Sequence, residues 1–192
     1  KFMIDLFGQA LLDYQNDNYT DDLYTETNIS EEDVLPLPYL FRSYSEMPPL
    51  EQLTISNASG KVLDVSCGPG SVSLYLQESG LDVMAIDSSD GAIEVCNLRG
   101  FKNAKEIDLL QLKDQKFDTV LLLMNGTGIF QKLEHIDQYL QHLKSLLNPE
   151  RQIIIDSSDL RYRYDSDDKE GSIVVPPDGY YAELKFTVYY KE

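Results

Sequence analysis

Short apolar segments alternate with helical segments between residues 61 and 156, and this alternation constrains the fold more than any other feature. The apolar segments span residues 61–66, 82–87, 104–108, 117–124 and 152–156. The intervening segments have apolar residues at helical spacing and end at Gly80, at Gly100 or before Pro149. Apolar strands that alternate with helices are typical of a parallel sheet buried on both faces. We therefore predict an α/β fold with a doubly wound, mostly parallel sheet and helices on both faces.

The segments on either side of this region have different patterns. Before it, residues 3–14 and 49–58 are expected to be helices, and the acidic, polar run 13–33 is interpreted as a flexible connector or lid. After it, apolar and polar residues alternate over 182–190, which predicts an antiparallel strand at the sheet edge. We divide the chain into an N-terminal helical cap or lid, residues 1–60, and a ligand-binding core, residues 61–192.

The charge of the chain disfavours several classes of partner. Its 33 acidic and 16 basic residues give a formal net charge of −17. Nucleic acid is an unfavourable partner because binding a phosphate backbone requires a basic surface. The sequence shows no apolar run of the roughly 20 residues that a membrane span needs, and no secretory leader. We expect a cytoplasmic protein without a nucleic-acid, membrane or metal partner.

The first strand–turn–helix unit, residues 61–80, is the expected ligand site. Ligands of open parallel sheets bind beyond the carboxyl ends of the strands. The turn contains Gly68 and Gly70, which allow close approach to the backbone. Ser71 is expected to cap the following helix, whose unpaired N–H groups face the ligand. The next strand ends at Asp87, and a carboxylate there can accept both hydroxyl groups of an adenosine ribose.

Two cofactors compete for this arrangement. A nicotinamide dinucleotide usually requires G-x-G-x-x-G, but Ser73 occupies the place of the third glycine. S-Adenosyl-L-methionine has no phosphate and places an amino-acid tail near the turn, where the acidic Asp64 on the first strand is favourable. The sequence therefore favours S-adenosyl-L-methionine.

The motif Val62-Leu-Asp-Val-Ser-Cys-Gly-Pro-Gly70 resembles the first motif of the class I S-adenosylmethionine-dependent methyltransferases. The resemblance continues through residues 83–87 and 116–120 and implies the Rossmann-like fold of that family. Residues 39–47 and 73–76 resemble the small-molecule branch, which includes tellurite-resistance methyltransferases and uncharacterised bacterial members.

The resemblance implies roles for individual residues. Asp64 supports the turn and the cofactor amine, Asp87 holds the ribose, and Asp108 accepts from the adenine amino group. Asn125 lies under the sulfonium, and Arg42 pairs with the cofactor carboxylate, with an ion pair between helices as its alternative role. The predicted cofactor-binding set is Asp64, Ser66, Cys67, Gly68, Gly70, Asp87, Ser88, Asp108, Leu109, Asn125 and Arg42.

Two features depart from the family pattern. Ser66 replaces a glycine and is expected to fit only at negative φ, so that it could weaken cofactor binding. The sixth strand of the family pattern would fall near the end of the sequence, so the final strand is expected to be missing. The resulting open sheet edge suggests a homodimer.

The leading hypothesis is a methyltransferase that acts on a small molecule by in-line displacement. Its substrate pocket is expected to include Tyr39, Tyr44 and Tyr162, and its catalytic residues are unknown from sequence. The alternative is a non-catalytic cofactor-binding or protein-interaction module of the same fold, motivated by Ser66 and the missing strand. An NAD(P)-binding oxidoreductase is the least favoured hypothesis.

Overall fold

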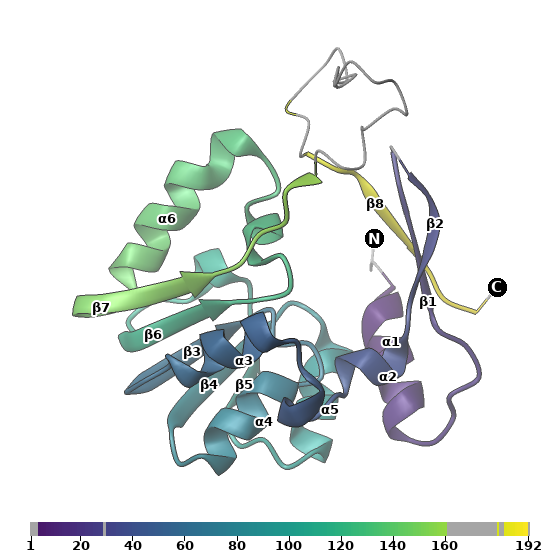
Figure 1. Cartoon of the computed structure of the whole chain (residues 1–192), viewed down its shortest axis with the longest axis horizontal. Coiled ribbons are helices and arrows are strands. Elements are labelled where there is room, and N and C mark those ends of the chain that lie inside the picture. Colours follow the sequence, from purple (N-terminus) through teal and green to yellow (C-terminus); the bar gives the residue numbers. More distant parts are fainter. Residues whose placement is uncertain (1–3, 29, 161–179, 181–182, 192) are drawn as a thin grey trace.

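The computed structural model of the chain describes residues 4–28, 30–160, 180 and 183–191, which form two sheets and the helices around them (Figure 1). The parallel sheet has the strand order β5-β4-β3-β6-β7, and the small antiparallel sheet has the order β2-β1-β8. The strands are β1 (Leu23–Thr27), β2 (Ser30–Leu35), β3 (Lys61–Val65), β4 (Asp82–Asp87), β5 (Ala104–Glu106), β6 (Phe117–Leu122), β7 (Leu147–Ile155) and β8 (Phe186–Tyr189). The helices are α1 (Leu6–Gln15), α2 (Leu37–Leu40), α3 (Pro49–Ser56), α4 (Ser71–Glu78), α5 (Asp90–Leu98) and α6 (Ile136–Ser145). Single 3₁₀ turns are η1 (Tyr44–Glu46), η2 (Leu109–Gln111), η3 (Gly126–Phe130) and η4 (Leu133–His135).

The parallel sheet is buried on both faces, as the alternation of apolar segments predicted. Along β3, Val62 packs into a cluster that contains Leu76 of α4, whereas Leu63 packs into a cluster that contains Leu143 of α6. Successive side chains of a strand point to opposite faces, so one short strand contributes to two cores. In Figure 1, α6 lies on one side of the sheet and α3 and α4 lie on the other. The predicted Rossmann-like α/β fold is confirmed.

The interpretation of residues 13–33 as a flexible connector was wrong. The strands β1 and β2 pair antiparallel as a hairpin, in which Leu23 pairs with Leu35. Leu23 is 1% exposed and packs with Leu11 of α1 and Leu37 of α2. The contact of Leu23 with Leu11 and Leu37 anchors the acidic segment in a buried cluster, which offsets the weak strand preference of its Asp and Glu residues.

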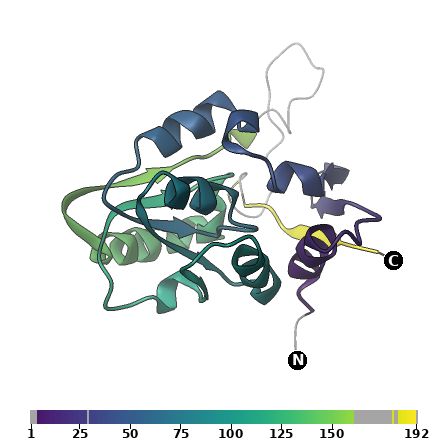
Figure 2. The same ribbon diagram turned by 90° about the horizontal axis from the view of Figure 1, so that it is seen from below.

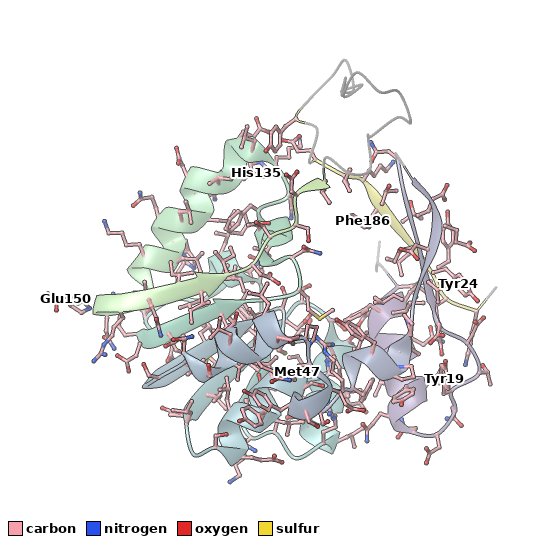
Figure 3. The ribbon with its side chains drawn as sticks, in the orientation of Figure 1. Tyr19, Tyr24, Met47, His135, Glu150 and Phe186 are labelled. Atoms are coloured by element: carbon pink, nitrogen blue, oxygen red, sulfur yellow. The ribbon has the colours of Figure 1, made fainter. Side chains whose placement is uncertain are left out.

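The antiparallel edge strand predicted over 182–190 is present as β8, but it belongs to the small sheet. It pairs with β1, with Tyr189 opposite Tyr24, and does not join the parallel sheet. Figure 3 shows the separation, because Glu150 of β7 and Phe186 of β8 lie on different sides of the molecule. The division of the chain at residue 60 stays a prediction, and β8 shares a sheet with β1 from the first segment.

The boundary between α6 and β7 differs from the predicted one. The helix ends at Ser145, and β7 begins at Leu147, so Asn148 and Pro149 lie within the strand. Pro149 is tolerated because β7 is an edge strand and its pairing with β6 is irregular between Phe117 and Thr119.

A third cluster joins the N-terminal segment to the core. Ala10 and Leu11 of α1 pack with Ala92 and Val95 of α5. Figures 1 and 2 both show α1 beside α5, close to the carboxyl end of β4. None of the helices in the described parts of the chain is long and apolar enough to cross a membrane.

Candidate cofactor site

The turn after β3 has three residues in the left-handed backbone region. Their φ values are 58° at Ser66, 53° at Gly68 and 80° at Gly70. Left-handed conformations are inexpensive for glycine, which explains the two glycines. The turn returns the chain into α4, and Cys67 N donates to Ile86 O at 3.1 Å, near the carboxyl end of β4.

Asp87 at the end of β4 is bound to this turn. Its two carboxylate oxygens accept hydrogen bonds from Gly68 N, at 2.9 Å, and from Ser89 N, at 3.0 Å. Burial raises the pKa of Asp87 although these bonds lower it, and the nearby charge of Asp5 raises it further. Two positions that the sequence predicted separately, Gly68 and Asp87, are therefore in direct contact.

Asp64 is buried beneath the turn and pairs with a side chain that sequence reasoning did not assign. Ser73 Oγ donates to Asp64 Oδ2 at 2.6 Å, and Ser73 is fully buried. Burial raises the pKa of Asp64 to about 7, and the charges of Asp87 and Glu51 contribute in the same direction. At the position where the dinucleotide motif has its third glycine, this chain has Ser73, and its hydroxyl group orients Asp64.

We predict that Asp64 makes the folded protein less stable as pH rises, whereas a carboxyl group with a lowered pKa would make it more stable. The folded carboxyl keeps its proton up to about pH 7, whereas the unfolded one releases it near 3.8, so folding takes up a proton between these values. The free energy of unfolding of the wild type, relative to that of Asp64→Asn, should fall as pH rises across this range and then level off. Urea unfolding of both proteins at several pH values measures the difference. Parallel pH profiles would contradict the assignment.

The backbone conformation of Ser66 differs from the predicted one. A serine was expected only at negative φ, but Ser66 has φ 58°. Its side chain is exposed, so its Cβ meets solvent and the turn keeps the shape that a glycine would give. The cost is backbone strain of about 1 kcal/mol.

The variant Ser66→Gly is therefore predicted to be more stable than the wild type, by about 0.5–1 kcal/mol. Relief of the left-handed strain outweighs the larger backbone entropy that glycine has in the unfolded chain. Chemical denaturation measures the change, with Ser79→Gly, at the negative φ of −76°, as control. The control should lose stability, and the same loss in Ser66→Gly would refute the strain argument.

The two cysteines lie behind the turn as free thiols. Cys67 Sγ and Cys96 Sγ are 3.9 Å apart, and Cys96 Sγ donates to Gly68 O at 3.3 Å. The neighbouring thiol and burial raise the pKa of Cys67. This position indicates a packing role for Cys67, and its predicted contact with the cofactor stays a prediction.

The predicted helix cap at Ser71 was wrong by one residue. Gly70 is the N-cap of α4, and Ser71 is the first helical residue. Ser71 Oγ donates to Leu40 O at 2.8 Å, so this serine ties α4 to α2 instead of capping its own helix.

The predicted adenine side of the site lies at the end of β5. Ile107 N donates to Asp87 O at 2.9 Å, which holds this segment against β4. Asp108 is exposed and caps η2 through Leu110 N, and Leu109 is buried. Ser88 is exposed beside Asp87. The contacts of Ser88, Asp108 and Leu109 with a cofactor stay predictions.

Asn125 lies past β6 on the same sheet edge. It has φ 62°, and its Oδ1 accepts from Ser158 Oγ at 2.5 Å. The next residue, Gly126, donates its N–H to Asp156 Oδ1 at 2.8 Å. Loops after β6 and β7 therefore support each other, and Asn125 remains exposed at the open side.

Arg42 is buried and forms the ion pair that was its alternative role. Its Nη2 contacts Glu51 Oε2 at 2.5 Å, and its Nη1 donates to Tyr39 O at 2.6 Å. Its Nε is buried without a hydrogen-bond partner in the described structure. A cofactor carboxylate is chemically suited to that N–H group, so the predicted role stays open.

The tyrosines predicted to line a substrate pocket occupy different environments. Tyr39 is 42% exposed and lies under the Arg42 guanidinium at 4.0 Å from its ring centroid. Tyr44 stacks on Tyr75 with ring centroids 4.0 Å apart, which indicates a packing role. Tyr162 lies outside the described residues.

Arg99 is a residue of the site that sequence reasoning missed. Its Nη1 donates to Pro69 O at 2.6 Å and to Ser71 Oγ at 3.1 Å, and its guanidinium lies 5.0 Å from the Phe41 ring centroid. Arg99 therefore stabilises the glycine turn through its hydrogen bond to Pro69 O. Arg99 is the C-cap of α5, and no local sequence pattern distinguishes it from other residues at helix ends.

The fold and this turn define a class of protein, and comparison with known proteins agrees with it. A family model described as a methyltransferase domain matches residues 56–175. A crystal structure of a SAM-dependent methyltransferase from Bacteroides fragilis in complex with S-adenosyl-L-homocysteine is 40% identical and has a TM-score of 0.89, covering 97% of this chain and 76% of that chain.

Two further matches are weaker. An uncharacterised methyltransferase of Staphylococcus carnosus (strain TM300) is 41% identical over 58 residues, which span 30% of this chain and only 27% of that protein. Streptomyces venezuelae DesVI is 20% identical with a TM-score of 0.52, over 64% of this chain and 55% of that one, and it shares the fold alone.

The chain belongs to the methyltransferase-domain family, within the class I SAM-dependent methyltransferase superfamily.

Proposed function

We propose that this chain transfers a methyl group from S-adenosyl-L-methionine to a small-molecule acceptor. The two carboxyl groups beside the glycine turn carry the proposal. Burial raises the pKa of both Asp64 and Asp87, and the nearby charges of Glu51 and Asp5, respectively, raise them further. A sulfonium and an ammonium group reduce this electrostatic cost, whereas the pyrophosphate of a dinucleotide would increase it.

The residues present fit this cofactor. A Cβ atom built on Gly68 would meet only Phe7 Cζ, at 3.9 Å, among the described residues, so the backbone there is open to a ligand. The unpartnered Nε of Arg42 is an N–H donor available for a carboxylate. The exposed Asp108 adds an acceptor at the end of β5.

When bound, S-adenosyl-L-methionine supplies a methyl group on a positively charged sulfur. The acceptor lone pair forms the new bond to the methyl carbon as the carbon–sulfur bond breaks, and S-adenosyl-L-homocysteine leaves. The residues of this chain bind, orient and shield the reactants, and alignment of this kind accounts for much of the rate of such a displacement. Asp87 fixes the turn and the ribose, and Ser73 orients Asp64.

The experiment is incubation of the protein with S-adenosyl-L-methionine labelled in its methyl group and a metabolite extract. Label in a small-molecule product supports the proposal and excludes a non-catalytic module. The Asp87→Ala variant is the control and should transfer far less label at the same cofactor concentration, because its affinity for the cofactor is expected to be much lower. Label found only in protein or nucleic acid would contradict the proposed acceptor class.

The proposal extends to the cellular location, the partners and the oligomeric state of the enzyme. We propose a cytoplasmic protein that acts on neither nucleic acid nor membranes, because its net charge of −17 repels phosphate-rich surfaces. We also propose a homodimer through the open sheet edge at β7, which is the last strand of the parallel sheet in the described structure. Light scattering of the purified protein tests the dimer.

A further inference from the structure

We propose that Phe7 is a cofactor-contacting residue, held over the glycine turn by a clasp between the N-terminal ends of α1 and α5. The clasp consists of Asp5, Gly8, Ser89 and Gly91. The inference rests on the proposed function and adds a wall to the cofactor site that comes from the N-terminal helix.

One carboxylate joins the two helix ends. Asp5 Oδ1 accepts from Gly8 N at 2.8 Å and caps α1. Asp5 Oδ2 accepts from Ser89 Oγ at 2.6 Å and from Gly91 N at 3.3 Å, at the start of α5. Burial alone would raise the pKa of Asp5, but these hydrogen bonds lower it overall. A negative charge between two helix N-termini is favourable, so the clasp is a stable contact.

The two helices also touch through their backbones. A Cβ atom on Gly91 would lie 2.5 Å from Gly8 Cα and 2.6 Å from the Gly8 carbonyl carbon. Real Cβ atoms do not approach a backbone this closely, so any larger residue at position 91 must displace α1. Gly91 does not have a positive φ, so close approach is the reason for this glycine.

The clasp places Phe7 beside the turn. Among the described residues other than the chain neighbours of Gly68, Phe7 Cζ alone lies within 4 Å of a Cβ built on Gly68, and Gly68 N is bound to Asp87. Phe7 is half-buried, so one part of the ring packs on the α1–α5 core and another part is free to contact a ligand. A ligand held at Gly68 and Asp87 would be shielded from water by this ring.

The test is calorimetric titration with S-adenosyl-L-homocysteine. Phe7→Ala should weaken binding about tenfold, Phe7→Leu should weaken it also, and Phe7→Tyr, which keeps the ring, should restore it to within about twofold. Gln9→Ala, an exposed change on the same helix, is the matched control and should bind as the wild type does. The free energy of unfolding is measured beside the affinity, and weaker binding by Phe7→Leu at an unchanged free energy of unfolding is a readout that loss of packing alone would not produce.

A double-mutant cycle tests the clasp. Gly91→Ala should weaken binding as Phe7→Ala does, and the double variant should bind no more weakly than either single one, because Phe7 acts only when α1 is seated. If Gly91→Ala does not fold, Asp5→Asn takes its place. Unchanged affinity in Phe7→Ala, or multiplicative effects in the cycle, would overturn this inference. Absence of binding by the wild type would instead overturn the proposed function.

Discussion

Replacement of Asp87 by alanine is expected to lower the affinity for S-adenosyl-L-homocysteine by about 100-fold or more. The Asp87 carboxylate accepts from Gly68 N and Ser89 N, and we assign it the ribose hydroxyls. Hydrogen bonds to a charged group contribute about 1.5–3 kcal/mol each, and the variant loses both the ligand contact and the shape of the turn. Calorimetric titration measures the change.

Two variants make this result specific. Asp87→Asn keeps the size of the side chain but turns one acceptor into a donor that faces an N–H group, so it should bind nearly as weakly as the alanine variant. Glu94→Ala removes an exposed carboxylate from α5 and should leave affinity unchanged. Near-normal binding by a folded Asp87→Ala protein would show that Asp87 does not hold the cofactor.

Replacement of Gly70 by alanine is expected to destabilise the protein by about 2–4 kcal/mol. Gly70 has φ 80°, and a Cβ atom there would lie 2.8 Å from Cys96 Sγ. The variant therefore combines backbone strain with a steric clash against a fully buried side chain. Thermal or chemical unfolding measures the loss.

Gly80 is a matched control for the strain alone. It has φ 87°, and a Cβ atom added there has nothing within 4 Å. Gly80→Ala should therefore cost only about 1 kcal/mol. In a Cys96→Ala background the cost of Gly70→Ala should fall to a similar value, because the clash is gone. An equal loss in Gly70→Ala and Gly80→Ala would contradict the close contact with Cys96.

The parallel sheet could be predicted from the sequence because each strand carries its own signal. The apolar runs of β3 and β4 are bounded by turn residues and need no distant partner to be recognised. The β1–β2 hairpin could not be predicted in this way. Its strands are acidic, and its third strand, β8, is far along the chain, so the pairing depends on tertiary contacts that a local pattern does not contain.

The same distinction applies to the site. Asp64 and Asp87 could be predicted because they lie at strand ends beside a glycine turn, where ligands of this fold bind. Arg99 and Asp5 could not be predicted, because their roles depend on the packing of α5 against the turn and against α1. Ser73 had a signal, since it replaces a glycine of the dinucleotide pattern, but its bond to Asp64 required the structure.

The most direct test of the central claim is calorimetric titration of the wild-type protein with S-adenosyl-L-homocysteine, with NADH as the competing cofactor. The carboxyl groups of Asp64 and Asp87 beside the glycine turn predict saturable binding of S-adenosyl-L-homocysteine and none of NADH. Absence of heat at high micromolar S-adenosyl-L-homocysteine, together with binding of NADH, would contradict the assignment of this turn as a methyltransferase cofactor site.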